Sequence, residues 1–227
     1  DQVLVMQPKY MQELNNVLET TSINDLKTLM KWSTIDNTAN YLTTEIEKTN
    51  WEFYSKRLYG SKAQRPAEER ALETVNGSVG EAIGQLYVDA KFPPEAKFKA
   101  EKMIANVIEA FQIRIQNLDW MSEITKTKAI EKLDKFTVKI AYPDKWKDMS
   151  ALELSRNSYV ENAINMNKWG YNFMIEKFGK PVNKDEWEMY PQTYNAYYDP
   201  TMNEIVVPAC NIIVPGFEGR MPDDAVL

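Results

Sequence analysis

The sequence predicts a mainly α-helical chain followed, near its C-terminal end, by a β-hairpin. Long stretches place apolar residues three and four positions apart, which is the period of an amphipathic helix. Residues that start and stop helices separate these stretches. Only the part from about residue 187 onward has the short β-favouring runs and turn residues of paired strands.

The first helices are recognised by their ends. Apolar residues at helical spacing mark residues 11–18, and Ser22 with Asp25 three positions later is typical of a helix start. A longer helix is expected over residues 40–58, where Gly60 suits its end.

Residues 66–92 are expected to form two helices. Pro66 suits a helix start, because its missing N–H costs least there, and Asn76-Gly77 is expected to break the chain before a second helix over 79–92. Gly80 and Gly84 lie inside that second helix. Each costs ~1 kcal/mol relative to alanine, so close packing against a neighbour is the expected compensation. The string GSVGEAIG lacks both the GK[ST] of a P-loop and a preceding strand, so no nucleotide site is expected.

The clearest helix begins at Pro93-Pro94. Its apolar stripe steps by four and three along one face, through Ile104, Ile108, Phe111, Ile115 and Leu118. Ser122 is expected to cap the next helix, which runs to about residue 136. KIAYPDKW then reads as an extended link, and a last helix is expected over 158–178 before Gly179 and Pro181.

The hairpin is expected from strands at 190–198 and 204–207, with Asp199-Pro200 and Asn203 as turn residues. Asn195 and Ala196 lie in the first of these strands, a candidate edge strand. An Asn amide offers a donor and an acceptor, and a small neighbour leaves the backbone accessible. This pair is therefore a candidate for holding a ligand, although the same Asn could simply bond within its own turn.

Composition excludes several function classes. The net charge of -6 and the pI near 5.0 argue against nucleic acid or an anionic membrane as partner. No segment approaches the ~20 apolar residues of a membrane span. The chain has no histidine, which removes histidine bases, Ser-His and Cys-His pairs and the commonest zinc ligand. The one cysteine, Cys210, excludes an internal disulfide and reads as a small hydrophobe rather than a reactive thiol.

Several long motifs, in order along the chain, resemble the neprilysin-type (M13) zinc endopeptidases, in particular the bacterial PepO-like members. They are VNGSVGEAIGQLYVDAKFPPEAK, NLDWMSEITKTKAIEKLDKFTVKIAYPDKW, KPVNKDEWEMYPQT and the hairpin PQTYNAYYDPTMNEIVVPA. The hairpin matches the segment that carries the family's Asn-Ala-x-Tyr motif. One departure follows it: ACNIIVPGF stands where the family often has a small residue and Ile-Leu-Gln-Pro-Pro-Phe. The specificity pocket is therefore not carried over.

The resemblance implies a helical shell around a chamber that limits substrate size, and a thermolysin-like catalytic domain that begins with the hairpin. Residues 1–185 are expected to belong to the shell and 186–227 to the start of the catalytic domain. The family's HExxH zinc helix follows GRMPDDAVL, where this chain stops. A central fragment is therefore expected, with no catalytic or metal-binding residue and no bound zinc of its own, although the full-length protein uses zinc. The rest of that catalytic domain is an expected partner.

The resemblance assigns substrate-backbone binding to Asn195 and Ala196, with peptides as partners. The alternative function is a non-catalytic helical module that binds a protein or peptide. The single cysteine indicates a bacterial source, because animal members are cysteine-rich ectodomains. DQVLVMQPKY does not read as a signal peptide. Periplasm or cell envelope is the expected location, with the cytoplasm as the alternative.

Overall fold

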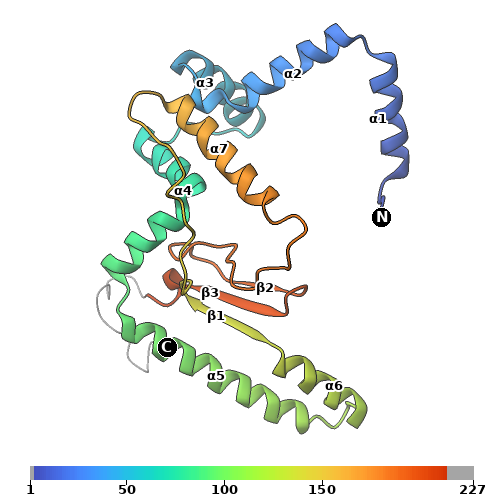
Figure 1. The fold of residues 1–227 in the computed structure, drawn as a ribbon, viewed down its shortest axis with the longest axis vertical. Helices are drawn as coiled ribbons and strands as arrows, with labels where there is room; N and C mark the ends of the chain where they lie inside the picture. Colours follow the sequence, from blue (N-terminus) through green and yellow to red (C-terminus); the bar gives the residue numbers. More distant parts are fainter. Residues whose placement is uncertain (1–2, 214–227) are drawn as a thin grey trace. The chain divides into compact units, whose positions relative to one another are not determined.

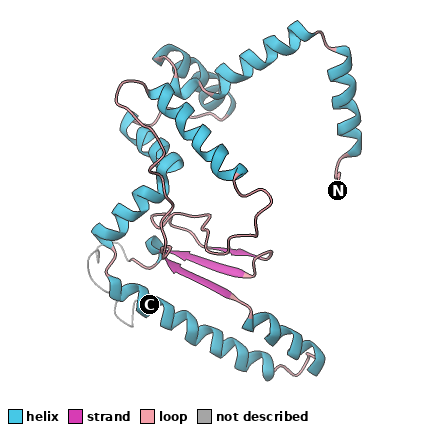
Figure 2. Cartoon of the chain, in the orientation of Figure 1, coloured by secondary structure: helices cyan, strands magenta, loops and turns pink. Residues whose placement is uncertain are grey.

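The computed structural model describes residues 3–213, and most of these are helical (Figures 1 and 2). The helices are α1 (Pro8–Thr20), α2 (Ile23–Asn37), α3 (Thr44–Trp51), α4 (Ala67–Lys91), α5 (Pro94–Gln116), α6 (Glu123–Asp134) and α7 (Tyr159–Ile175). The strands β1 (Thr137–Ala141), β2 (Tyr197–Asp199) and β3 (Glu204–Pro208) form one small sheet, and a 3-10 turn, η3 (Ala209–Asn211), follows β3. The expected mainly α fold with a C-terminal hairpin is confirmed. The segment GRMPDDAVL lies outside the described residues.

The chain divides into two compact units. Residues 3–65 and 155–164 form the first, and residues 66–154 and 165–213 form the second. The domain boundary expected near residue 185 stays a prediction. No helix in the described range is long and apolar enough to cross a bilayer.

In the first unit, the cap at Ser22 is confirmed, since its side chain accepts the Asp25 N–H at the start of α2. Gly60 ends the following helical stretch with φ 73°. The single helix expected over 40–58 is wrong, because α3 begins only at Thr44 and continues as a π-helix over Glu52–Leu58. The Thr43 hydroxyl accepts the Ile46 N–H and so starts a new helix inside the apolar pattern.

In the second unit, the two helices expected over residues 66–92 are found within α4, and they meet at a kink at Val79 (φ −122°, ψ 31°), two residues after the expected break at Asn76-Gly77. The Ser78 hydroxyl donates to the Thr74 carbonyl at 2.7 Å, one turn earlier. Such side-chain bonds to the helix's own carbonyls often bend helices rather than end them. The Asn-Gly pair therefore belongs to a bent helix.

The small sheet has the strand order β1-β3-β2. β3 pairs parallel with β1, with Lys139 opposite Val206, and antiparallel with β2, with Tyr197 also opposite Val206. The extended link expected at KIAYPDKW is in part the strand β1 (Thr137–Ala141), which was not predicted. Lys139 interrupts its apolar run, and its partner strand lies far along the sequence, so local pattern does not reveal it.

The hairpin is confirmed, but its first strand covers only Tyr197–Asp199 instead of 190–198. The residues before it form tight turns, in which Thr193 N–H donates to Tyr190 O and Asn195 N–H donates to Thr193 O. Pro191 has no N–H to give a strand ladder. Local bonds therefore replace strand pairing in this stretch.

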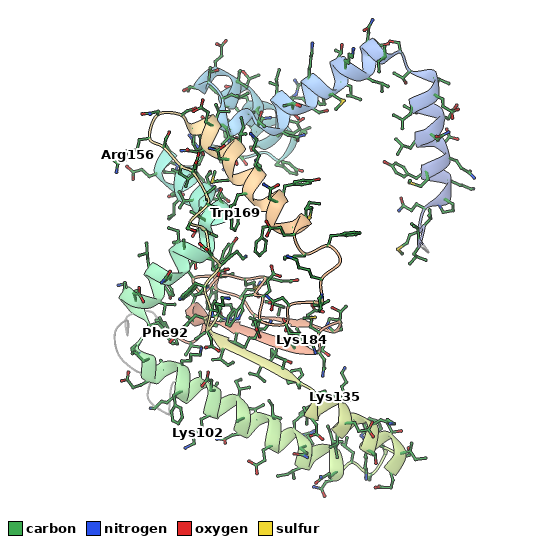
Figure 3. The ribbon with its side chains drawn as sticks, viewed as in Figure 1. Phe92, Lys102, Lys135, Arg156, Trp169 and Lys184 are labelled. Atoms are coloured by element: carbon green, nitrogen blue, oxygen red, sulfur yellow. The ribbon has the colours of Figure 1, made fainter. Side chains whose placement is uncertain are left out.

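The core of the second unit lies where α4, α5 and the sheet meet. Its buried side chains come from the end of α4, the start of α5, β1 and η3, and comprise Val88, Phe92, Ala96, Ala100, Ile140, Ala141, Ala209 and Ile212. Phe92 lies just beyond the end of α4 (Figure 3). Its ring meets Tyr142 edge-on at 5.9 Å, which extends the core into the loop after β1. This core anchors β1, which pairs with β3, and η3, which follows β3, so it fixes the second strand of the hairpin.

Candidate functional site at the hairpin

The two candidate binding residues lie at the entrance to the hairpin. Asn195 and Ala196 are exposed and come directly before β2. Because β2 pairs only with β3 among the described strands, its other edge is unpaired. Within residues 3–213, β2 is therefore an edge strand, and Asn195 and Ala196 lie at its N-terminal end rather than within it.

The peptide group between Asn195 and Ala196 is held at both ends. The Asn195 carbonyl accepts a hydrogen bond from Asn211 Nδ2 at 2.5 Å. The Ala196 N–H donates to Asn195 Oδ1 at 2.8 Å. Within the described part of the chain, these bonds leave Asn195 Nδ2 and the Ala196 carbonyl as the groups of this pair without a hydrogen-bond partner.

The segment before the site is packed onto α4 at two glycines. A Cβ on Gly80 would lie 2.2 Å from Tyr190 Cε2, and a Cβ on Gly84 would lie 2.6 Å from Pro191 Cδ. Both distances are shorter than a side chain tolerates, so only glycine permits this approach. The close packing expected at Gly80 and Gly84 is confirmed, and the neighbour is the segment that leads to Asn195.

Gln192 adds polar contacts to the same helix. Its Nε2 donates to Gly80 O at 2.9 Å and to Asn76 Oδ1 at 3.0 Å. Asn76, which was expected to mark a break, thus accepts a hydrogen bond from the segment that leads to the site. This segment, residues 190–196, is called the site segment below. Farther along, Cys210 N–H donates to Pro191 O at 2.9 Å, which ties the segment to η3 as well. Cys210 itself is a free, half-buried thiol.

A buried ion pair joins the strands β1 and β3. Lys139 Nζ is 2.8 Å from Glu204 Oε2, and the two side chains are 8% and 5% exposed. Oε2 has no hydrogen bond of good geometry, so charge rather than a directed bond holds it. Lys139 Nζ also donates to Glu186 O at 2.7 Å, which joins the chain leading into the site to β1. Each charge depends on the other, because unpaired buried charges are strongly destabilising.

The hairpin turn rests on α6. Asn203 Nδ2 donates to Lys132 O at 2.9 Å, and the Tyr198 hydroxyl bonds to Asn203 Oδ1 at 3.0 Å. The Tyr198 ring stacks on Phe136 with centroids 5.9 Å apart. These contacts attach the turn end of the hairpin to α6 and to Phe136, which follows it.

Three side chains around the site have shifted pKa values. Burial, and then the charge of Glu81, raise the pKa of Tyr190, and burial also raises the pKa of Tyr197. The two tyrosines therefore stay neutral at physiological pH. In the turn, hydrogen bonds from the Thr201 hydroxyl and N–H lower the pKa of Asp199, so this carboxylate is charged and acts as a turn acceptor.

The donor set in this part of the protein does not fit zinc. Residues 3–213 contain no group of three or more His, Cys, Asp or Glu side chains that could hold a metal ion. Stable zinc sites draw mainly on His and Cys, and the sequence has one Cys and no His. No step of a reaction can be assigned to a metal held by these residues.

A hollow in the second unit lies elsewhere. It has a volume of ≈ 550 Å³ and is lined by residues including Lys168, Trp169, Phe173 and Glu176 of α7 and the turn after it. Trp169, labelled in Figure 3, stacks on Phe173 at 5.5 Å. Neither Asn195 nor Ala196 lines this hollow, so the exposed edge beside β2 is the better candidate for binding an extended chain.

Sequence reasoning assigned no role to Gln192 or Asn211. Asn211 belongs to the stretch ACNIIVPGF, where the sequence departs from the family pattern, and that departure was the available signal. Gln192 lies inside the motif KPVNKDEWEMYPQT, but its hydrogen-bond partners on α4 are more than a hundred positions away in the sequence. Only the folded chain brings them together.

Comparison with known proteins agrees with this architecture. The family model described as peptidase family M13 matches residues 1–143. Mouse neprilysin is 32% identical over 96% of this chain and 30% of its own length. The neutral endopeptidase of Lactobacillus helveticus is 29% identical over 96% of this chain and 34% of its own length. The chain thus spans about a third of the length of these relatives.

Solved structures show the same relationship. The open state of the zinc metalloprotease Zmp1 of Mycobacterium tuberculosis aligns with a TM-score of 0.86 and 37% identity, over 98% of this chain and 34% of that one. PepO of Lactobacillus rhamnosis aligns with a TM-score of 0.73 and 25% identity, over 81% of this chain and 29% of that one. The family model, the relatives and the structures agree, and the chain belongs to peptidase family M13.

Proposed function

We propose that this chain is the part of a zinc-dependent endopeptidase that binds the backbone of peptide substrates of limited size through Asn195 and Ala196. The observation that carries the proposal is that one edge of β2 is unpaired within residues 3–213, with Asn195 and Ala196 exposed at its start. A substrate peptide in extended form has unpaired N–H and C=O groups along its length. An open strand edge binds such groups largely independently of the substrate's side chains.

Two polar groups at the start of this edge are available to the substrate. Asn195 Nδ2 is a donor for a substrate carbonyl, and the Ala196 carbonyl is an acceptor for a substrate N–H. The Asn195 carbonyl, Asn195 Oδ1 and the Ala196 N–H already have hydrogen-bond partners within the protein. The pair therefore offers one donor and one acceptor in a fixed arrangement, which suits a single peptide unit.

Zinc supplies the activation of water and polarisation of the scissile carbonyl in zinc peptidases. The described residues do not form that site, so the proposal assigns it to the remainder of the protein, which is also the structural partner of the hairpin. Within this chain the function is to bind and orient the substrate backbone.

Asn195→Ala in the full-length protein tests the proposal. Loss of the side-chain amide leaves a substrate carbonyl unpaired, at a cost of ~1–3 kcal/mol, which corresponds to a drop of roughly 5- to 150-fold in kcat/KM. Zinc content and melting temperature should stay near wild type, because the exposed side chain contributes little to stability. The measurements are kcat/KM on one peptide, zinc stoichiometry and Tm.

Asn183→Ala is a matched control. Asn183 is also exposed and also accepts a nearby main-chain N–H, that of Asp185 at 3.1 Å. It should leave kcat/KM unchanged. If Asn195 serves only its own turn, Asn195→Ala should instead lower Tm and leave kcat/KM normal. A stable, zinc-replete Asn195→Ala enzyme with wild-type kcat/KM removes Asn195 from the site.

A further inference from the structure

The Asn195 amide is oriented through its own peptide group. In a planar trans peptide, the C=O and the N–H point in opposite directions. A hydrogen bond that fixes the direction of one group therefore also fixes the direction of the other. The N–H end, on Ala196, donates to Asn195 Oδ1 and thereby selects the orientation of the side-chain amide. Rotation of this peptide plane would turn Nδ2 away from its present direction.

The other end of the same peptide group is held by one side chain. Asn211 Nδ2 donates to the Asn195 carbonyl at 2.5 Å, across a sequence separation of 16 residues. Asn211 is the last residue of η3, and the buried Ala209 and Ile212 on either side belong to the core of the second unit. The donor is therefore anchored in packed structure, whereas its acceptor lies in an exposed turn.

A second bond makes this a two-point attachment. Cys210 N–H, one residue before Asn211, donates to Pro191 O at 2.9 Å. The main chain of η3 thus holds the start of the site segment and the Asn211 side chain holds its end. The main-chain bond survives any substitution at Asn211, so the two contributions can be separated by mutation.

We propose that Asn211 is a positioning residue, whose side-chain amide fixes the Asn195–Ala196 peptide group and so directs the Asn195 amide to the substrate backbone. This inference rests on the proposed function of Asn195. Asn211 does not itself touch the substrate. Its bond takes up the Asn195 carbonyl, which directs the substrate to the two groups that remain, Asn195 Nδ2 and the Ala196 carbonyl.

The test uses the full-length enzyme with Asn211→Ala and Asn211→Asp. Asn211→Ala removes one neutral hydrogen bond, so kcat/KM should fall by roughly 2- to 10-fold. Because a backbone contact contributes to substrate and transition state alike, the change should appear as a higher KM with kcat nearly unchanged. Asn211→Asp keeps the shape but places a carboxylate against the carbonyl, and should cost at least as much. Zinc content should be unchanged in both.

Asn117→Ala is the matched control, because Asn117 Nδ2 also donates to a main-chain carbonyl, that of Ile113 at 2.8 Å, at the end of α5. It removes the same kind of bond away from the hairpin and should leave KM unchanged. If Asn211→Ala lowers Tm like the control and leaves KM at the wild-type value, Asn211 is only structural and the inference is overturned.

A double-mutant cycle separates this inference from the proposed function. If Asn211 acts through Asn195, Asn195→Ala/Asn211→Ala should lose no more kcat/KM than Asn195→Ala alone, since no amide remains to be oriented. Fully additive losses contradict the inference. If Asn195→Ala lowers kcat/KM and Asn211→Ala does not, the inference is wrong and the proposed function stands. Wild-type kcat/KM for Asn195→Ala defeats the proposed function, and the inference with it.

Discussion

Adding one methyl group at Gly84 should loosen the site segment, although alanine is the better helix former. A Cβ at Gly84 would lie 2.6 Å from Pro191 Cδ and 2.9 Å from Gln192 Oε1. Pro191 is fully buried and its ring is part of the main chain, so it cannot rotate away. Relief requires a shift of the 190–192 backbone, and overpacking of this kind costs about 1–3 kcal/mol.

Gly77 provides the matched comparison in the same helix. A Cβ at Gly77 meets no atom within 4 Å, so Gly77→Ala should gain up to ~1 kcal/mol of helix propensity. The two identical substitutions should therefore change the free energy of unfolding in opposite directions. Their difference is set by the contact with Pro191 and not by the helix.

Hydrogen exchange followed by mass spectrometry, together with thermal melting, measures both variants in the full-length protein. In Gly84→Ala the peptide covering residues 190–196 should exchange roughly 5- to 150-fold faster, the equivalent of about 1–3 kcal/mol. Its kcat/KM should fall because Asn195 follows the displaced segment, while zinc content stays constant. If Gly84→Ala is as stabilising as Gly77→Ala, with unchanged exchange, the packing argument is refuted.

Two further predictions concern the charges around the sheet. Lys139→Met leaves Glu204 buried without its partner and should destabilise the protein by about 3–5 kcal/mol in urea unfolding, whereas Lys139→Met/Glu204→Leu should recover most of the loss; a double variant as unstable as the single one would contradict the pairing. For Asp199, the folded-state pKa is lowered by Thr201, so its contribution to the turn is present above the ordinary aspartate pKa and is lost as pH falls through the lowered value. An NMR titration of the Asp199 carboxyl should show a midpoint below that of a free aspartate, and the shift should become smaller when Thr201→Val removes the hydroxyl donor but keeps the N–H donor.

The sequence by itself determined the features that depend on neighbours within a few residues. The caps at Ser22 and Ser122 and the helix start at Pro93-Pro94 all appear in the structure. Their signals are side-chain to main-chain bonds and an apolar period, both of which act over one or two turns. The hairpin turn is of the same kind, since Asp199 accepts from Thr201 two residues later. The family resemblance likewise rested on ordered motifs and needed no fold.

The tertiary structure determined the features that depend on contacts between residues far apart in the sequence. The strand β1 exists because β3 pairs with it, and its lysine is buried only because Glu204 supplies the opposite charge. In α4 the Asn-Gly pair indicated that a break was near, and the folded chain places it two residues later, at Val79. Local sequence patterns carry no information about such partners, because the stabilising free energy comes from contacts that form only when the whole unit folds.

The candidate site divides in the same way. Sequence singled out Asn195 and Ala196 and predicted that Gly80 and Gly84 pack closely, since each residue type has its own chemical reason. Which surface those glycines meet, and which donor holds the Asn195 carbonyl, depends on how α4 and η3 lie against the site segment. A hydrogen bond needs its two atoms within about 3.5 Å, and only the folded chain brings Asn211 that close to Asn195.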